Sequence, residues 1–112
     1  MWNTPTEARL NKLPKIYDQS CMPIKDQTVH LHFFYGGSDW YVTEYDGFDS
    51  FFGVVILNND KQNMELGYFS FKELKDIKMQ MGMEIDCEKA KFFPPQKIKD
   101  ISNLKDWVKK FN

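Results

Sequence analysis

The chain has 112 residues, of which 42% are hydrophobic and 16% aromatic, so it is long and apolar enough to fold around a core and is not a disordered tail. The formal net charge is −1, but residues 1–88 carry 8 basic and 14 acidic residues, whereas residues 89–112 carry 7 basic and 2 acidic ones. We therefore expect one domain, 1–112, with an acidic body (1–88) and a basic C-terminal segment (89–112). Cys21 and Cys87 are too few for a disulfide framework, and no apolar run approaches the roughly 20 residues of a membrane span, so we expect a cytoplasmic protein with reduced thiols.

The N-terminal residues predict a short helix. Thr4 is a capping residue, a proline at the first helical position follows it, and Glu7 completes a capping box. We expect this helix to run to about Lys12, where Pro14 ends it. Residues 15–27 are polar and predict a connecting loop.

From Thr28 the apolar residues recur with a period of two, which is typical of strands. His30, His32 and Phe34 alternate with Val29, Leu31, Phe33 and Tyr35. The pattern predicts four strands, at residues 28–35, 40–45, 51–57 and 64–69, with turns at Gly36-Gly37-Ser38-Asp39, Asp46-Gly47 and Asn58-Asn59-Asp60. The third strand is almost continuously apolar, so we expect it to lie centrally with both faces buried.

The remainder of the chain predicts helices packed on this meander. Ser70 opens a second capping box and a short helix that ends near Lys78, and residues 83–87 predict a short edge strand. A final amphipathic helix is indicated by Ile101, Leu104, Val108 and Phe111, which share one helical face. The expected fold is α+β: an antiparallel four- to five-stranded meander sheet with a short N-terminal helix, a short helix after the fourth strand and a C-terminal amphipathic helix packed on the sheet.

The 35 residues from Asp26 to Asp60 contain no Lys or Arg, yet carry six acids and nine aromatic residues. An acidic, aromatic-rich surface favours a protein partner or a cation and disfavours nucleic acid. The partner-binding candidates are Trp40, Tyr41, Glu44, Asp46 and Asp49, with Trp40 or Tyr41 as the desolvated anchor unless both faces of the sheet are covered. Asp46 and Asp49 also have a purely structural interpretation, because aspartate is a common turn residue.

Two other interpretations stay open. His30 and His32 share a strand face, and with Glu44 on the neighbouring strand they are candidate metal ligands of a small metal-dependent enzyme; two exposed strand histidines are the simpler explanation. The C-terminal lysines could contact a nucleic-acid backbone: Lys97, Lys99, Lys105, Lys109 and Lys110. The sequence has no nucleophile elbow, phosphate loop or dinucleotide motif, so we expect neither an enzyme nor a cofactor.

Several runs resemble an uncharacterised family of small single-domain bacterial proteins, a domain of unknown function. They are MWNTPT, LHFFYGGSDWYVTEYDG, FFGVVILNND and ELGYFSFKEL. Members of that family occur on plasmids, phages and other mobile elements, so the resemblance implies an accessory protein of a mobile element. It implies no activity and no catalytic residues.

These observations together predict a non-enzymatic protein-binding accessory protein. One version inhibits a host defence system that targets nucleic acid, with the acidic aromatic face occupying a basic groove. The oligomeric state is open, because an edge strand could pair across a two-fold axis but nothing requires it.

Overall fold

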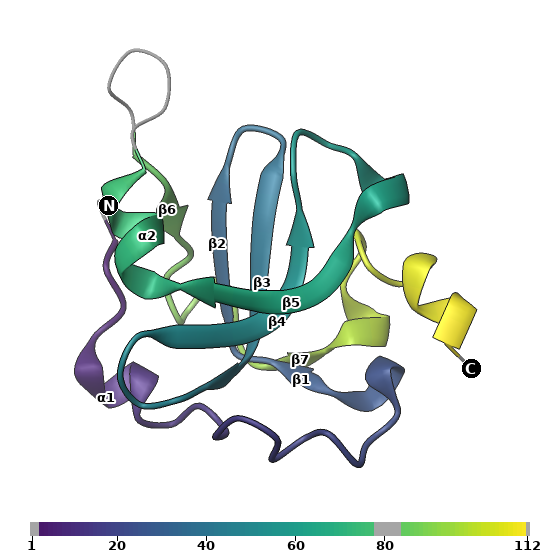
Figure 1. The fold of residues 1–112 in the computed structure, drawn as a ribbon, viewed down its shortest axis with the longest axis horizontal. Coiled ribbons are helices and arrows are strands. Elements are labelled where there is room, and N and C mark those ends of the chain that lie inside the picture. The colour runs from purple at the N-terminus through teal and green to yellow at the C-terminus, as the bar shows by residue number, and fades with distance from the viewer. Residues whose placement is uncertain (1–2, 78–83, 112) are drawn as a thin grey trace.

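The computed structural model describes residues 3–77 and 84–111, which form a five-stranded sheet with short helices on its flanks (Figure 1). The main sheet contains β2 (Leu31–Tyr35), β3 (Ser38–Tyr45), β4 (Ser50–Ile56), β5 (Glu65–Ser70) and β6 (Asp86–Cys87). A small second sheet contains β1 (Thr28–Val29) and β7 (Gln96–Lys97). The α-helices are α1 (Glu7–Leu10) and α2 (Phe71–Asp76), and the 3-10 helices are η1 (Ile24–Asp26), η2 (Lys61–Asn63), η4 (Ile98–Asp100) and η5 (Trp107–Phe111). No helix in the described ranges is long and apolar enough to cross a membrane.

The order of strands in the main sheet is β5-β4-β3-β2-β6, and every neighbouring pair is antiparallel. The predicted α+β class and four-stranded meander are therefore confirmed, and β6 adds the predicted short strand at the edge beside β2. The turns also lie where the glycines and asparagines indicate. Gly36 and Gly47 have positive φ angles of 53° and 88°, a conformation that glycine adopts without steric cost.

The predicted first strand, 28–35, is divided at His30. β1 pairs with β7, whereas β2 pairs with β3 and β6. A continuous strand would direct Val29 and Leu31 to the same face. The division instead places Val29 in the core on one side of the sheet and Leu31 in the core on the other.

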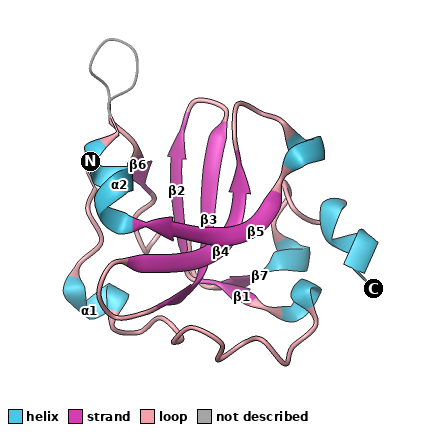
Figure 2. Ribbon diagram, in the orientation of Figure 1, coloured by secondary structure: helices cyan, strands magenta, loops and turns pink. Residues whose placement is uncertain are grey.

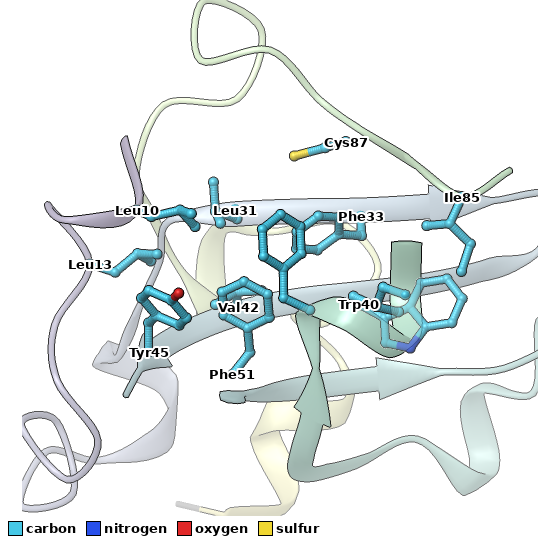
Figure 3. Packing of buried hydrophobic residues seen from close by; sticks show 12 residues of the cluster. Leu10, Leu13, Leu31, Phe33, Trp40, Val42, Tyr45, Phe51, Ile85 and Cys87 are labelled. Carbon is cyan, nitrogen blue, oxygen red and sulfur yellow. The ribbon is translucent and has the colours of Figure 1, made fainter. Parts of the chain in front are cut away.

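The first core lies on the face that α1 and α2 cover, and Ile85 and Cys87 at the β6 edge of the sheet also contribute to it (Figures 1 and 3). Figure 3 shows Leu10 and Leu13, from the N-terminal region, at one end of this cluster and Trp40 and Ile85 at the other. Phe33 and Phe51 are fully buried between them, with ring centroids 5.5 Å apart. Such tilted ring pairs add to the stabilisation that burial provides.

The second core lies on the opposite face and is closed by the C-terminal segment, residues 98–111 (Figure 1). Tyr41, Val54 and Ile56 face it from the sheet, and Leu104 and Trp107 cover them. Both faces are therefore buried over the middle of the sheet. Every residue of β3 from Trp40 to Tyr45 is buried, so β3 is more central than β4. The predicted burial of residues 51–57 on both faces is confirmed except at Phe52 and Val55, which are half-buried, and at Leu57, which is exposed.

The prediction that the C-terminal segment forms an amphipathic helix is wrong. Residues 98–111 form η4, a run of turns and η5, and Figure 2 shows these short helical pieces separated by loop. The predicted apolar positions Ile101, Leu104 and Val108 are buried on the sheet, but Phe111 is exposed and Trp107 is buried. The segment contains two Asp, one Ser and one Asn, which are weak helix formers. It keeps isolated helical hydrogen bonds, such as the one from the N–H of Val108 to the carbonyl of Leu104, but no continuous α-helix.

The two α-helices are confirmed, with shorter bounds. The cap of α1 is Thr6 rather than Thr4, since its hydroxyl accepts a hydrogen bond from the backbone N–H of Arg9, and the helix ends at Leu10 rather than Lys12. Ser70 caps α2 as predicted by accepting from the N–H of Glu73. That helix ends at Asp76, and the predicted end near Lys78 lies outside the described residues, as does Met83.

Candidate functional site

A row of three side chains crosses the main sheet beside the second core. Glu44 of β3 is opposite Phe52 of β4, and Phe52 is opposite Tyr68 of β5. Directly opposed residues on adjacent strands have neighbouring side chains on the same face. The register therefore places a carboxylate next to two aromatic rings.

A β-bulge at Thr43 sets this register. Val42 is opposite Gly53, but the next pair is Glu44 with Phe52, so Thr43 is the extra residue. Its hydroxyl donates to the carbonyl oxygen of Phe52 at 2.9 Å. In an unbulged strand Glu44 would be opposite Phe51 and would face the first core. The bulge turns this carboxylate to the face that carries Phe52 and keeps Tyr45 packed against Phe51.

The loop between α1 and η1 runs past Glu44, and Figure 2 shows it along one edge of the molecule. The Glu44 carboxylate accepts the backbone N–H groups of Tyr17 and Gln19 at 3.1 and 2.7 Å. The Gln19 side chain in turn bonds to the backbone N–H and carbonyl of Thr28 and to the carbonyl of Thr43. This buried side chain is fully paired, so the loop is fixed against the sheet. Tyr17 is held there at a φ of 76°, which is uncommon for a residue other than glycine.

Between the loop and the sheet is a pocket of about 280 Å³. Its lining comprises three rings, two aliphatic side chains and three polar ones: Tyr17, Phe52, Tyr68, Ile24, Leu66, Ser20, Gln27 and Glu44. Among the described residues, none that lines the pocket is Lys or Arg. Tyr17 and Tyr68 are exposed, at 71% and 58%, whereas Glu44 is only 4% exposed, so the rings surround the mouth and the carboxylate lies deeper.

The rings form a connected group. The centroids of Phe52 and Tyr68 are 4.9 Å apart in an edge-to-face arrangement, and the Tyr68 hydroxyl donates to that of Tyr17 at 3.5 Å. This hydrogen bond, partial desolvation and the negative charge of Glu44 together raise the pKa of Tyr68. Each Glu44 oxygen accepts one N–H bond and keeps a further lone pair, so the carboxylate can still accept from a ligand.

Three of the five partner-binding candidates lie in the interior. Trp40 and Tyr41 are 6% and 3% exposed, in the first and second cores respectively. The prediction of an exposed Trp40 or Tyr41 anchor is therefore wrong, because both faces of the sheet are covered. The third, Glu44, is 4% exposed and lines the pocket.

Asp46 and Asp49 lie in the turn between β3 and β4, where they organise the backbone. One Asp46 oxygen accepts the N–H groups of Phe48, Asp49 and Ser50. Slight desolvation raises the pKa of Asp46, but these hydrogen bonds outweigh it, and its pKa lies below the usual value. Asp49 accepts the N–H of Lys72 at 2.8 Å and the Ser70 hydroxyl, and so ties the turn to α2. Their structural interpretation is supported, and a role in binding stays a prediction.

The candidate metal ligands are not brought together. The two ring nitrogens of His32 lie 2.7 Å from Glu88 and 2.7 Å from Asp39, and the ring stacks on Tyr41 at a centroid distance of 4.4 Å. Glu44 is bonded to the loop at the other end of β3, and desolvation lowers the pKa of His30. No group of three potential ligands that could hold a metal ion occurs in the described part of the chain.

The sequence interpretation selected Glu44 as a site residue but did not select Phe52, Tyr17 or Tyr68. The alternation of Leu66 and Tyr68, matched to Val54 and Phe52 on the preceding strand, could have placed Tyr68 beside Phe52. No sequence pattern marks Tyr17, because its position depends on hydrogen bonds across the loop.

Comparisons with known proteins identify a family whose function is unknown. No curated protein and no solved structure matches the chain. The family model described as "Protein of unknown function (DUF2958)" matches residues 8–109, nearly the whole sequence, and includes every residue that lines the pocket. The chain belongs to this DUF2958 family.

Proposed function

We propose that this protein is a small, non-enzymatic accessory protein of a mobile element that binds a protein partner at the pocket between the loop and the sheet. The observation that carries the proposal is the row Glu44–Phe52–Tyr68, which places a buried carboxylate behind exposed rings. Aromatic residues are enriched at the centres of protein interfaces, where they contribute much of the binding energy.

The charge distribution supports a basic partner. Glu44 lies in the pocket, no Lys or Arg is among its described lining residues, and Glu65 on the outer strand β5 is exposed. A surface of one sign accelerates association with a surface of the other sign. We extend the proposal to a host protein that acts on nucleic acid, since such proteins present basic grooves. Binding of this protein to the basic groove of a defence protein would inhibit that defence system.

A nucleic-acid partner is less well supported. The C-terminal lysines are exposed because the segment directs its apolar side chains to the sheet. However, Lys99 and Lys109 lie 3.5 Å from the carboxylates of Asp26 and Asp106, which reduce the net charge that a phosphate backbone would meet.

The proposal is tested by affinity capture from a bacterial host lysate, followed by calorimetry with the purified captured partner. We expect Tyr68→Ala to weaken binding by about tenfold or more, since truncating an interface aromatic often costs over about 1.4 kcal/mol. Tyr68 is exposed on the edge strand β5, so the fold should tolerate its truncation.

The matched control is Phe92→Ala, which removes another exposed ring that does not line the pocket. Its affinity should equal that of the unmodified protein. A partner that binds the unmodified protein and Tyr68→Ala equally would exclude the pocket as the binding surface.

A further inference from the structure

We infer that the pocket receives a single arginine side chain projecting from the partner. This inference rests on the proposed function and specifies the chemistry of the same site. It depends on the size of the pocket, on the arrangement of its polar and apolar lining residues, and on its charge.

The size favours one side chain. The volume of about 280 Å³ lies just below the range of about 300–1,000 Å³ that is typical of pockets for small molecules and cofactors. A long, unbranched side chain entering from a neighbouring surface fits inside this volume.

The walls match the two parts of an arginine. Ile24, Leu66 and Phe52 provide apolar surface for the three methylene groups. Glu44 and the hydroxyl oxygens of Tyr17 and Tyr68 provide acceptors. A guanidinium group carries five N–H donors in a plane and also stacks on aromatic rings, so it can use both the rings and the carboxylate. A quaternary ammonium group has no donor and would leave the acceptors unused, and the ammonium of lysine is more strongly hydrated.

The charge of the site is complementary to a cation. Glu44 is more than nine-tenths buried, its two loop hydrogen bonds come from neutral N–H groups, and no basic side chain among the described residues lines the pocket. A carboxylate with no cationic partner in a largely apolar surround attracts a positive ligand more strongly than the same group in water.

The experiment is an NMR titration of the isotope-labelled protein with N-acetyl-arginine methylamide. The controls are the corresponding citrulline compound, which has nearly the same shape without the charge, and the lysine compound. We expect the arginine probe to perturb the amide signals of Tyr17, Gln19 and Tyr68, and to bind about tenfold more tightly than the citrulline probe. Tyr68→Ala should weaken arginine binding at least about fivefold, and Phe92→Ala should leave it unchanged.

The possible results separate this inference from the proposed function. Equal binding of the arginine and citrulline probes, perturbations confined to other surfaces, or no binding up to the solubility limit would each overturn the arginine assignment. Tighter binding of the lysine probe would identify an ammonium group as the preferred ligand and would also overturn the arginine assignment. A captured partner whose affinity still depends on Tyr68 would then leave the proposed function standing, whereas a partner insensitive to Tyr68→Ala would remove that function whatever the probes do.

Discussion

Gly53 of β4 lies opposite Val42, next to the bulge in β3 that turns Glu44 toward the pocket. A Cβ atom there would lie 1.8 Å from the carbonyl oxygen of Tyr41 and 2.8 Å from its carbonyl carbon. These are backbone atoms of the adjacent strand at the bulge, so no side-chain rotation relieves the contact. We therefore expect Gly53→Ala to destabilise the protein by about 3 kcal/mol, at the upper end of the usual range for overpacking. Urea unfolding followed by circular dichroism measures this change.

The chain contains a matched control for this substitution. Gly67 is directly opposite Gly53 on β5, and a Cβ atom there would meet nothing within 4 Å. Gly67→Ala should change stability by no more than about 1 kcal/mol, since it only restricts the unfolded chain or perturbs the strand slightly. If the two variants unfold at the same urea concentration, the close approach of β3 and β4 at the bulge is not a feature of the folded protein.

The elements of the fold were predictable where a local pattern determines them. Alternating apolar residues and one continuous apolar run identified four strands, glycine and asparagine marked the turns, and Ser70 marked the start of α2. The pairing of Thr28 and Val29 with residues 96–97 was missed because it depends on contacts between distant parts of the chain. The bulge at Thr43 was missed for a similar reason, because an extra residue in one strand has no local signature here.

The same distinction applies to the candidate site. Glu44 and the aromatic stretch were recognisable from composition. Which rings are exposed depends on what covers each face of the sheet, and the C-terminal segment and α2 are far from β3 in sequence. Trp40 and Tyr41 therefore lie in the interior, whereas Tyr17 and Tyr68 are the exposed rings that line the pocket with Glu44.

The C-terminal segment stabilises the fold through side-chain packing. It lacks a continuous α-helix over residues 98–111, so buried residues such as Leu104, which is fully buried in the second core, hold it to the sheet. We expect Leu104→Ala to cost about 2–4 kcal/mol in the free energy of unfolding. The neighbouring exposed Lys105 provides the comparison, and Lys105→Ala should cost less than about 0.5 kcal/mol. Equal urea midpoints for the two variants would show that the segment is not docked in solution.

At the scale of the whole molecule, both cores contain a group that resists ionisation. Burial raises the pKa of Cys87, on the α-helical side of the sheet, from 9.0 to about 11, although Arg9 opposes the shift. Burial also raises the pKa of Tyr41, on the other side, from 10.0 to about 12; the hydrogen bond from Asn103 opposes this, and the charges of Asp39 and Glu88 add to it. The folded protein therefore holds both protons more tightly than the unfolded chain does.

This difference predicts the alkaline limit of stability. The contribution of each group is complete below its unfolded pKa and is lost as the pH rises through its folded pKa, over pH 9 to 11 for Cys87 and pH 10 to 12 for Tyr41. A shift of two units corresponds to about 2–3 kcal/mol for each group. The urea concentration at the midpoint of unfolding should stay constant as the pH is raised to 9 and should decrease above pH 9.

Tyr41→Phe separates the tyrosine from every other group that titrates at high pH. The variant keeps the ring that stacks on His32 but loses the hydroxyl to which Asn103 donates. Because it lacks this hydrogen bond, the variant should be less stable than the unmodified protein by about 1 kcal/mol at neutral pH. Between pH 10 and 12 it should lose less stability than the unmodified protein, because it has no hydroxyl to ionise. The two curves must therefore converge as the pH rises. Parallel curves over that range would mean that the Tyr41 hydroxyl is accessible to water, and hence that the C-terminal segment does not close the second core.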